Sequence, residues 1–138
     1  MLHLTKLAVG ARDVAALRAL QAARAQTDAP LRHRTRNAPR RAAEVVDGGS
    51  IYWVVAGAML VRQLVLDVVA DHWEDGAACA GLVLDPTLVA VEGRPVKAFQ
   101  GWRYLPAHEA PPDLADGAAG RHGLPDAMAL ELRRLCLL

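Results

Sequence analysis

Residues 50–84 read SIYWVVAGAMLVRQLVLDVVADHWEDGAACAGLVL and are dense in β-branched and aromatic side chains. Such residues favour strands over helices, and short runs of them divided by turn signals indicate a sheet. We predict a strand from Ile51 to Val55, a turn at residues 56–58, and a long strand, or a pair broken by a bulge, from Met59 to Asp71. Asp75-Gly76 is a strong hairpin signal that returns the chain into a strand from Ala77 to Leu84.

Two further strands are expected after this hairpin. Turn signals at Asp85-Pro86 and at Gly93-Arg94-Pro95 enclose a short strand from Thr87 to Val91, and Lys97 to Tyr104 forms the last strand. Short strands joined by tight turns favour an antiparallel meander. Closing the meander into a small barrel would remove its exposed edges.

Helices are expected on both sides of this sheet in the sequence. After an opening strand from Leu2 to Val9, Asp13 can cap a helix that ends before Pro30. Pro39 can open a short helix through Val46, and Pro125 suits the first turn of a C-terminal helix. We therefore predict one α+β domain over residues 1–138, with a small antiparallel β-barrel or curved meander and an N-terminal and a C-terminal helix.

Composition and spacing exclude several classes of protein. The charge-free stretch from Gly48 to Val61 is shorter than the roughly 18 residues of a spanning helix, and the N-terminus lacks a secretory signal pattern. We expect a cytoplasmic protein with no membrane partner. Cys79 and Cys136 lie far apart, which suits reduced thiols, and the five histidines show no metal-ligand spacing. We expect no metal and no cofactor; the oligomeric state stays open.

The formal net charge of +1 hides a strong asymmetry along the chain. Residues 1–41 carry nine basic and two acidic side chains, a net charge of +7, whereas the remainder carries −6. Fourteen of the sixteen basic residues are arginine, whose planar fork matches phosphate and carboxylate oxygens. The clustering favours an anionic partner.

The arginine cluster is followed by aromatic residues on predicted strands. Charge for phosphate, a π face for a base and an amide for its edge are what unpaired nucleotides require. We predict that Arg32, Arg34, Arg36, Arg40 and Arg41 contact phosphate, with His33 among them. Trp53 or Trp102 would stack, and Gln63, Gln100, Arg62 or Arg103 would contact polar groups of the ligand. The first hypothesis is therefore a binding module for RNA or a nucleotide-like anionic ligand.

Two other classes of function remain open. A small hydrolase or nuclease would use His33 as acid or base with Asp67 or Glu44, and the same arginines would hold an anionic substrate. A protein-interaction module would instead pair the basic segment with the acidic remainder of another copy.

Several segments resemble a bacterial family catalogued as domain of unknown function 1489. They are residues 31–41, 47–55, 62–63, 84–86 and 99–105, and together they span most of the chain. The family commonly has a lysine where Ala56 stands here, so a contact made by that lysine would be lost or altered in this chain. The family implies no activity. The layout is also similar to the PUA-like barrels, including ASCH and EVE domains, and that resemblance implies binding of RNA or modified bases.

Overall fold

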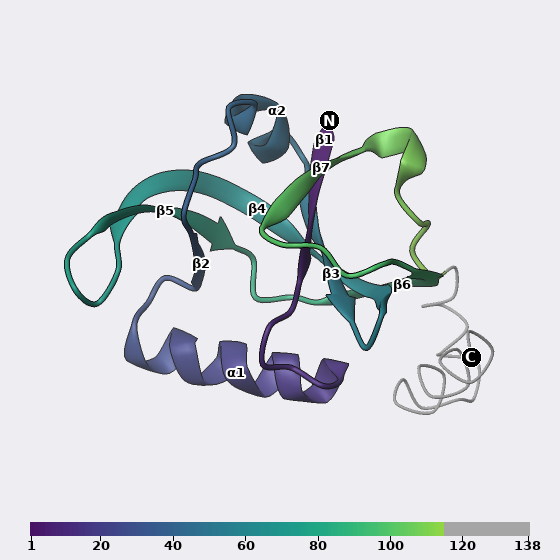
Figure 1. The fold of residues 1–138 in the computed structure, drawn as a ribbon, viewed down its shortest axis with the longest axis horizontal. Coiled ribbons are helices and arrows are strands. Elements are labelled where there is room, and N and C mark those ends of the chain that lie inside the picture. The colour runs from purple at the N-terminus through teal and green to yellow at the C-terminus, as the bar shows by residue number, and fades with distance from the viewer. Residues whose placement is uncertain (115–138) are drawn as a thin grey trace.

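The computed structural model of the chain describes residues 1–114 (Figure 1). Its strands are β1 (Leu2–Leu7), β2 (Arg32–Thr35), β3 (Ser50–Val55), β4 (Ala58–His72), β5 (Ala78–Leu84), β6 (Val89–Pro95) and β7 (Trp102–Pro106). Its helices are α1 (Val14–Thr27), α2 (Ala42–Val46) and the single 3-10 turn η1 (Ala107–Glu109). The helix expected after Pro125 and the thiol of Cys136 lie outside the described residues.

The seven strands form one mixed sheet, which confirms the α+β class. The strand order is β2-β5-β4-β3-β1-β7, and β6 pairs with β4 beside this path. β1 pairs with β3 in parallel, because the chain between them crosses over through α1, β2 and α2, while every other pair is antiparallel. The sheet is not closed into a barrel: β2 and β7 stand at its two ends. The expectation of a wholly antiparallel arrangement was wrong.

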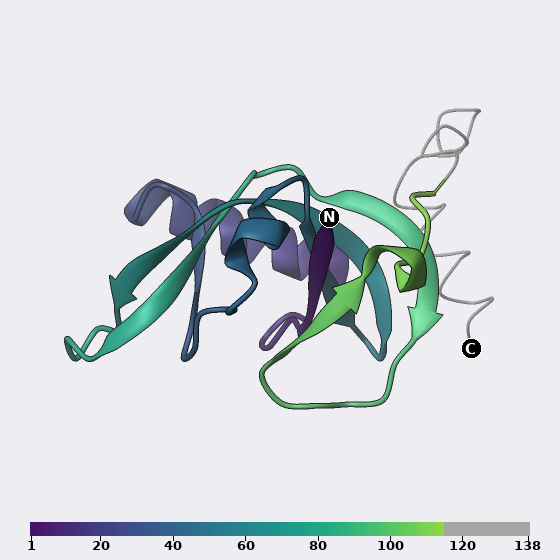
Figure 2. The same ribbon diagram turned by 90° about the horizontal axis from the view of Figure 1, so that it is seen from above.

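β4 is the longest strand and joins the two parts of the sheet. Its first half pairs with β3 and β6, and its second half pairs with β5. The register between β4 and β5 shifts between Val65 and Asp67. The side chains of β4 therefore do not alternate regularly between the two faces of the sheet along its whole length. Figure 2 shows the resulting curvature, with the β4–β5 hairpin extending away from the rest of the sheet.

α1 covers one face of the sheet. Asp13 caps the helix as predicted, since its Oδ1 accepts a hydrogen bond from the backbone N–H of Ala16 at 2.7 Å. Val14 and Leu17 face inward and belong to the same core cluster as Trp53 of β3. No helix within residues 1–114 has the length and apolar character required to cross a membrane.

The opposite face of the sheet carries a second, smaller core. It contains Tyr52, Val54, Met59, Val91, Phe99 and Leu105. Neighbouring residues of β3 therefore enter different cores, and both Tyr52 and Trp53 are buried, with 4% and 3% of their surface exposed. Trp53, one of the two rings expected to stack on a ligand, is therefore not exposed for stacking.

Two strand boundaries differ from prediction because pairing overrides local turn signals. Residues 93–95 continue β6, since Arg94 and Pro95 pair with Met59 and Ala58 of β4, and proline is tolerated at a strand end. β7 starts only at Trp102, so Gln100 is an exposed residue outside the strand and does not share a strand face with Trp102.

Gly49 precedes β3 and has no room for a side chain. A Cβ at this position would collide with the backbone carbonyl oxygens of Leu2 and Val45. Replacing Gly49 by alanine is expected to lower the free energy of unfolding by about 3 kcal/mol, measured by urea denaturation. Gly10→Ala is the control: its Cβ meets nothing within 4 Å, and only its φ of +86° costs about 1 kcal/mol. Equal losses of stability in Gly49→Ala and Gly10→Ala would contradict the close approach of the Leu2 and Val45 carbonyl oxygens to Gly49.

Candidate functional site

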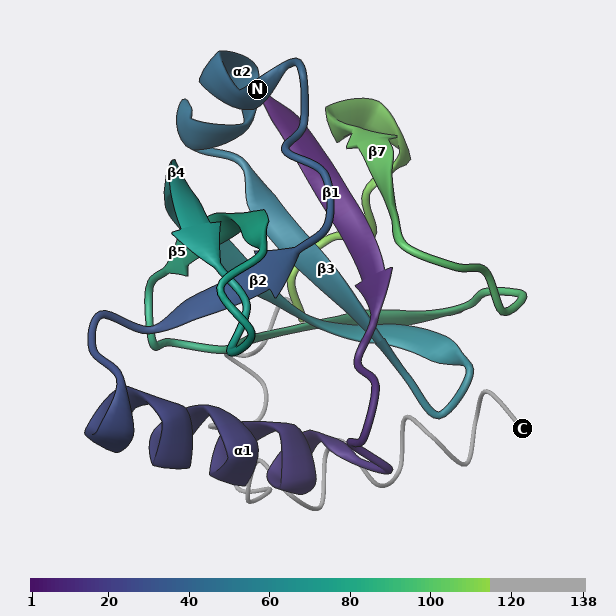
Figure 3. The same ribbon diagram turned by 60° about the vertical axis from the view of Figure 1, so that its left-hand side comes forward.

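Two connected cavities lie between α1, β2 and the β4–β5 hairpin. The inner cavity has a volume of about 180 Å³ and the outer one about 870 Å³. They share the side chains of Lys6, Val9, Arg24, Arg32 and His33, and we call them together the α1–β2 groove. Figure 3 shows β2 crossing in front of β1 and β3, above α1.

Two cations line this groove without a carboxylate partner. Lys6 lies on β1 and Arg24 on the last turn of α1, and within residues 1–114 neither forms an ion pair. No Asp or Glu of the described part lines the inner cavity. Burial lowers the pKa of the Lys6 ammonium, because a charge that loses water without gaining a counter-ion is destabilised. An anion bound between Lys6 and Arg24 would supply that counter-ion.

His33 stands beside these cations as a neutral imidazole. Its ring packs edge-on against Trp53, with the ring centroids 5.1 Å apart. Desolvation by burial, followed by the positive charges of Lys6 and Arg24, lowers the pKa of His33 to about 4. Nε2 of His33 is fully buried and has no hydrogen-bond partner among residues 1–114. Buried polar atoms are nearly always hydrogen-bonded, so this nitrogen is an exception among the described residues.

Gln63 and Gln21 form a closed amide pair beneath the groove. Each Nε2 donates to the other residue's Oε1 at 2.8 Å, which ties α1 to β4. Oε1 of Gln63 also accepts from Trp53 Nε1 at 3.0 Å, and its Nε2 also donates to the carbonyl of Asp85 at 2.8 Å. The side chain of Gln63 is wholly buried and its hydrogen-bonding capacity is used. Gln63 therefore holds the groove together rather than contacting a ligand.

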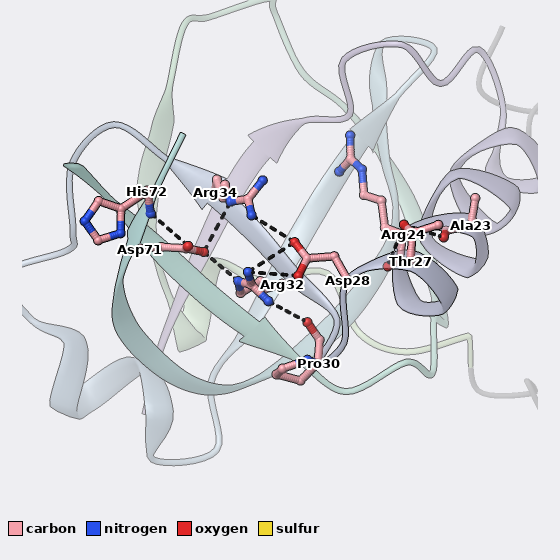
Figure 4. A network of polar contacts seen from close by, with 9 residues as sticks. All are labelled: Ala23, Arg24, Thr27, Asp28, Pro30, Arg32, Arg34, Asp71 and His72. Atoms are coloured by element: carbon pink, nitrogen blue, oxygen red, sulfur yellow. Dashed lines mark hydrogen bonds and ion pairs between the residues drawn. The ribbon is translucent and has the colours of Figure 1, made fainter. Parts of the chain in front are cut away.

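Arg32 and Arg34 of β2 are tied into a network of ion pairs (Figure 4). Nε of Arg32 lies 2.6 Å from Asp71 Oδ2, and Nη2 of Arg34 lies 2.9 Å from Asp28 Oδ2. The hydrogen bond from Arg32, followed by the backbone N–H of His72, lowers the pKa of Asp71 to about 2. The network fastens β2 to the end of α1 and to β4. The Arg24 guanidinium stands apart from it (Figure 4).

The other predicted site residues lie in two further places. Arg36 and Arg40 are exposed in the segment after β2. Arg41 pairs with Glu44 and lies over the Tyr104 ring at 5.7 Å. This segment also contacts β7, because Trp102 Nε1 donates to the carbonyl of Asn37 at 3.0 Å.

The last two predicted arginines belong to the opposite face of the sheet. Arg103 stacks over the Phe99 ring at 4.5 Å, and Arg62 pairs with Asp113. The structure thus brings Arg32, His33, Arg34 and Trp53 together at one groove and leaves the other predicted contacts outside it.

The acid–base pairs considered for a hydrolase are not formed. Within residues 1–114, His33 makes no hydrogen bond or ion pair with Asp67 or Glu44. Glu44 is paired with Arg41, and Asp67 accepts from the backbone N–H of Val68. A histidine with a pKa of about 4 is also a weak general base at neutral pH.

Sequence reasoning missed three residues of the groove: Lys6, Arg24 and Trp73. Trp73 lies at the tip of the β4–β5 hairpin, lines the outer cavity and is 41% exposed. Lys6 follows Leu2 and Leu4 on the inward face of β1, so a charge that continues an inward-facing pattern was the available signal for this residue. Arg24 is an exposed residue on the last turn of α1, and its position carries no such signal.

The lowered pKa of His33 makes folding stability depend on pH. The unfolded chain binds the proton more tightly, so this contribution is complete above pH 6.5 and is lost as the pH falls towards 4. We expect the His33→Gln variant to remove about 2 kcal/mol of the stability difference between pH 7 and pH 4.5, measured by urea denaturation. The same pH dependence in both proteins would show that His33 is not buried as a neutral group.

Removing the Gln63 amide is expected to destabilise the fold. Gln63→Leu leaves the Trp53 indole N–H and the Gln21 amide unpaired, which costs about 3 kcal/mol in urea denaturation. The matched control is Gln26→Leu on the exposed side of α1, the helix that carries Gln21, with a change below about 0.5 kcal/mol. Adding Gln21→Leu to Gln63→Leu should recover part of the lost free energy of unfolding, because no Gln21 amide is then left buried without a hydrogen-bond partner. If the losses of stability from Gln21→Leu and Gln63→Leu simply add in the double variant, the two amides do not pair.

Comparison with known proteins places the chain in one family. No curated protein and no solved structure matched it. The similarity of layout to the PUA-like barrels is therefore not confirmed, and the sheet is open. The family model described as "Protein of unknown function (DUF1489)" matches residues 4–138. The chain belongs to the DUF1489 family.

Proposed function

We propose that the protein is a binding module for RNA or a nucleotide-like anionic ligand, and that the ligand lies in the α1–β2 groove. The observation that carries this proposal is the pair of cations, Lys6 and Arg24, that have no ion-pair partner among residues 1–114 and line an inner cavity with no carboxylate from that part of the chain. A phosphate group between them would neutralise two charges that the fold leaves without counter-ions.

The groove also offers the groups that recognise a base. Trp73 presents an exposed ring at the outer end, where a base can stack, since Trp53 is too deeply buried for that role. The neutral His33 provides a hydrogen-bonding nitrogen at the inner end. Apolar side chains, including Leu17, Leu31 and Leu84, complete the inner wall.

The distribution of charged residues along the groove predicts the orientation of the bound ligand. Three carboxylate residues, Asp28, Glu74 and Asp75, line the outer cavity, whereas the charged residues among the described lining of the inner cavity are all cationic. A phosphate is therefore expected at the inner end, near Lys6 and Arg24, and the base at the hairpin end. Arg34 keeps guanidinium N–H groups beyond those used for Asp28 and Asp71, so it can add a second phosphate contact.

The test removes the two unpartnered cations and leaves the ion-pair network intact. We expect Lys6→Met/Arg24→Gln to weaken binding of a short single-stranded RNA by tenfold or more. It should also reduce the slope of log affinity against log salt by about 1.4, which is about 0.7 for each lost phosphate contact. Fluorescence anisotropy over a range of salt concentrations measures both quantities.

A charge-matched variant provides the control. Arg12→Gln/Arg18→Gln removes the same charge from exposed positions that line neither cavity, and should change the affinity little. Equal effects of the two double variants would mean that binding depends on net charge and not on the groove. Absence of RNA binding by the unaltered protein, together with no binding of mononucleotides, would refute the proposed function.

A further inference from the structure

A third cavity lies on the opposite face of the sheet, away from the α1–β2 groove. Its volume is about 340 Å³, and we call it the opposite-face pocket. His3 of β1, Tyr52 of β3 and Arg62 of β4 form one wall, and residues 110–113 form another. Tyr52 and Arg62 are cross-strand partners, whereas Trp53, the next residue along β3, packs on the α1 side. The two sites therefore share the strands β1 and β3 and, among residues 1–114, no lining residue.

His3 presents a hydrogen-bond donor to this pocket. Its Nδ1 accepts a hydrogen bond from the backbone N–H of Ser50 at 2.9 Å, so the proton of the neutral ring is on Nε2. Desolvation, followed by the charge of Arg62, lowers the pKa of His3 and keeps the ring neutral. Nε2 has no partner among residues 1–114, yet it is not one of the fully buried unpartnered atoms there. Nε2 therefore keeps some exposed surface, and His3 is one of the residues that line the pocket.

Tyr52 adds a second donor. Its ring meets the His3 ring edge-on, with the centroids 5.0 Å apart. Burial raises the pKa of the Tyr52 hydroxyl, so the group stays protonated at neutral pH. Like Nε2 of His3, the hydroxyl has no hydrogen-bond partner in the described part of the chain and keeps access to solvent.

Arg62 supplies positive charge together with unused N–H groups. Its Nε and Nη2 donate to the two carboxylate oxygens of Asp113 at 2.6 and 2.8 Å, and its Nη1 donates to Ser50 Oγ at 3.1 Å. A guanidinium carries five N–H groups, so two remain after these three bonds. Asp113 holds the guanidinium in place, and among residues 1–114 it is the one carboxylate that lines the pocket.

We propose that the opposite-face pocket binds a small oxyanion, a carboxylate or phosphate group, through Nε2–H of His3, the hydroxyl of Tyr52 and the free N–H groups of Arg62. All three groups donate, so an acceptor with several oxygens satisfies them together. They also project from adjacent strands of one sheet, which fixes their positions before a ligand arrives. Asp113 positions Arg62 and, through its negative charge, weakens the binding of an anion.

The experiment follows the imidazole resonances of the full chain by ¹H–¹⁵N NMR at neutral pH. Inorganic phosphate and acetate are titrated separately to millimolar concentrations. We expect at least one of them to shift the Nε2–H signal of His3 saturably. Saturation by phosphate alone would identify a phosphoryl ligand, and saturation by acetate alone a carboxylate. If neither anion shifts the signal, the proposal is wrong.

Two conservative variants test the assigned contacts. Tyr52→Phe removes only a hydroxyl that has no hydrogen-bond partner among residues 1–114, so the fold of this part is kept, and the anion should bind about tenfold more weakly. Asp113→Asn removes the competing negative charge and keeps an oxygen for Arg62, so the anion should bind severalfold more tightly. Unchanged affinity in both variants would overturn the proposal.

The double variant Lys6→Met/Arg24→Gln separates this pocket from the α1–β2 groove. It is expected to leave the His3 titration unchanged, because those side chains lie on the other face. A His3 shift that disappears in this variant would show that the anion acts from the groove and would refute a separate site. Loss of RNA binding in the same variant, with the His3 titration intact, would support both proposals independently.

Discussion

The alternation of side chains along β3 is the constraint on which both sites depend. This strand is buried over its whole length, paired in parallel with β1 and antiparallel with β4. Successive side chains of a strand face opposite sides of the sheet. Trp53 therefore meets His33 and Gln63 under α1, while Tyr52 meets His3 and Arg62 on the other face. A shift of one residue in this register would exchange the walls of the two cavities.

Three of the nine basic side chains in residues 1–41 are used in ion pairs within the described part of the molecule. Arg32 and Arg34 are held by Asp71 and Asp28, and Arg41 is held by Glu44. Such pairs leave little net potential for an external phosphate, since each guanidinium already has a carboxylate beside it. The cations that remain free in the groove, Lys6 and Arg24, lie outside the dense arginine run. A cluster of charge in the sequence is thus a poor guide to the charge that a ligand meets.

The sequence predicted the features that depend on nearby residues. The Asp13 cap, the turn at Ala56-Gly57 with both φ values positive, and the hairpin at Asp75-Gly76 are local and were confirmed. The parallel pairing of β1 with β3 and the continuation of β6 through Pro95 depend on contacts between distant segments, which override local signals. The candidate groove was missed in part for the same reason, because Lys6 and Arg24 meet His33 only when β2 pairs with β5 at the edge of the sheet.

Gln63 and His33 differ in how far their hydrogen-bonding capacity is used. Both side chains contact Trp53 under α1. Gln63 makes four hydrogen bonds and satisfies its whole amide, whereas Nε2 of His33 has no partner within residues 1–114. Leaving a buried nitrogen unpaired costs about 1–3 kcal/mol, and the half-buried Lys6 adds a further cost on the same wall. One bound anionic ligand with a polar edge would remove both costs, because it brings a counter-ion and a hydrogen-bond partner to the same cavity.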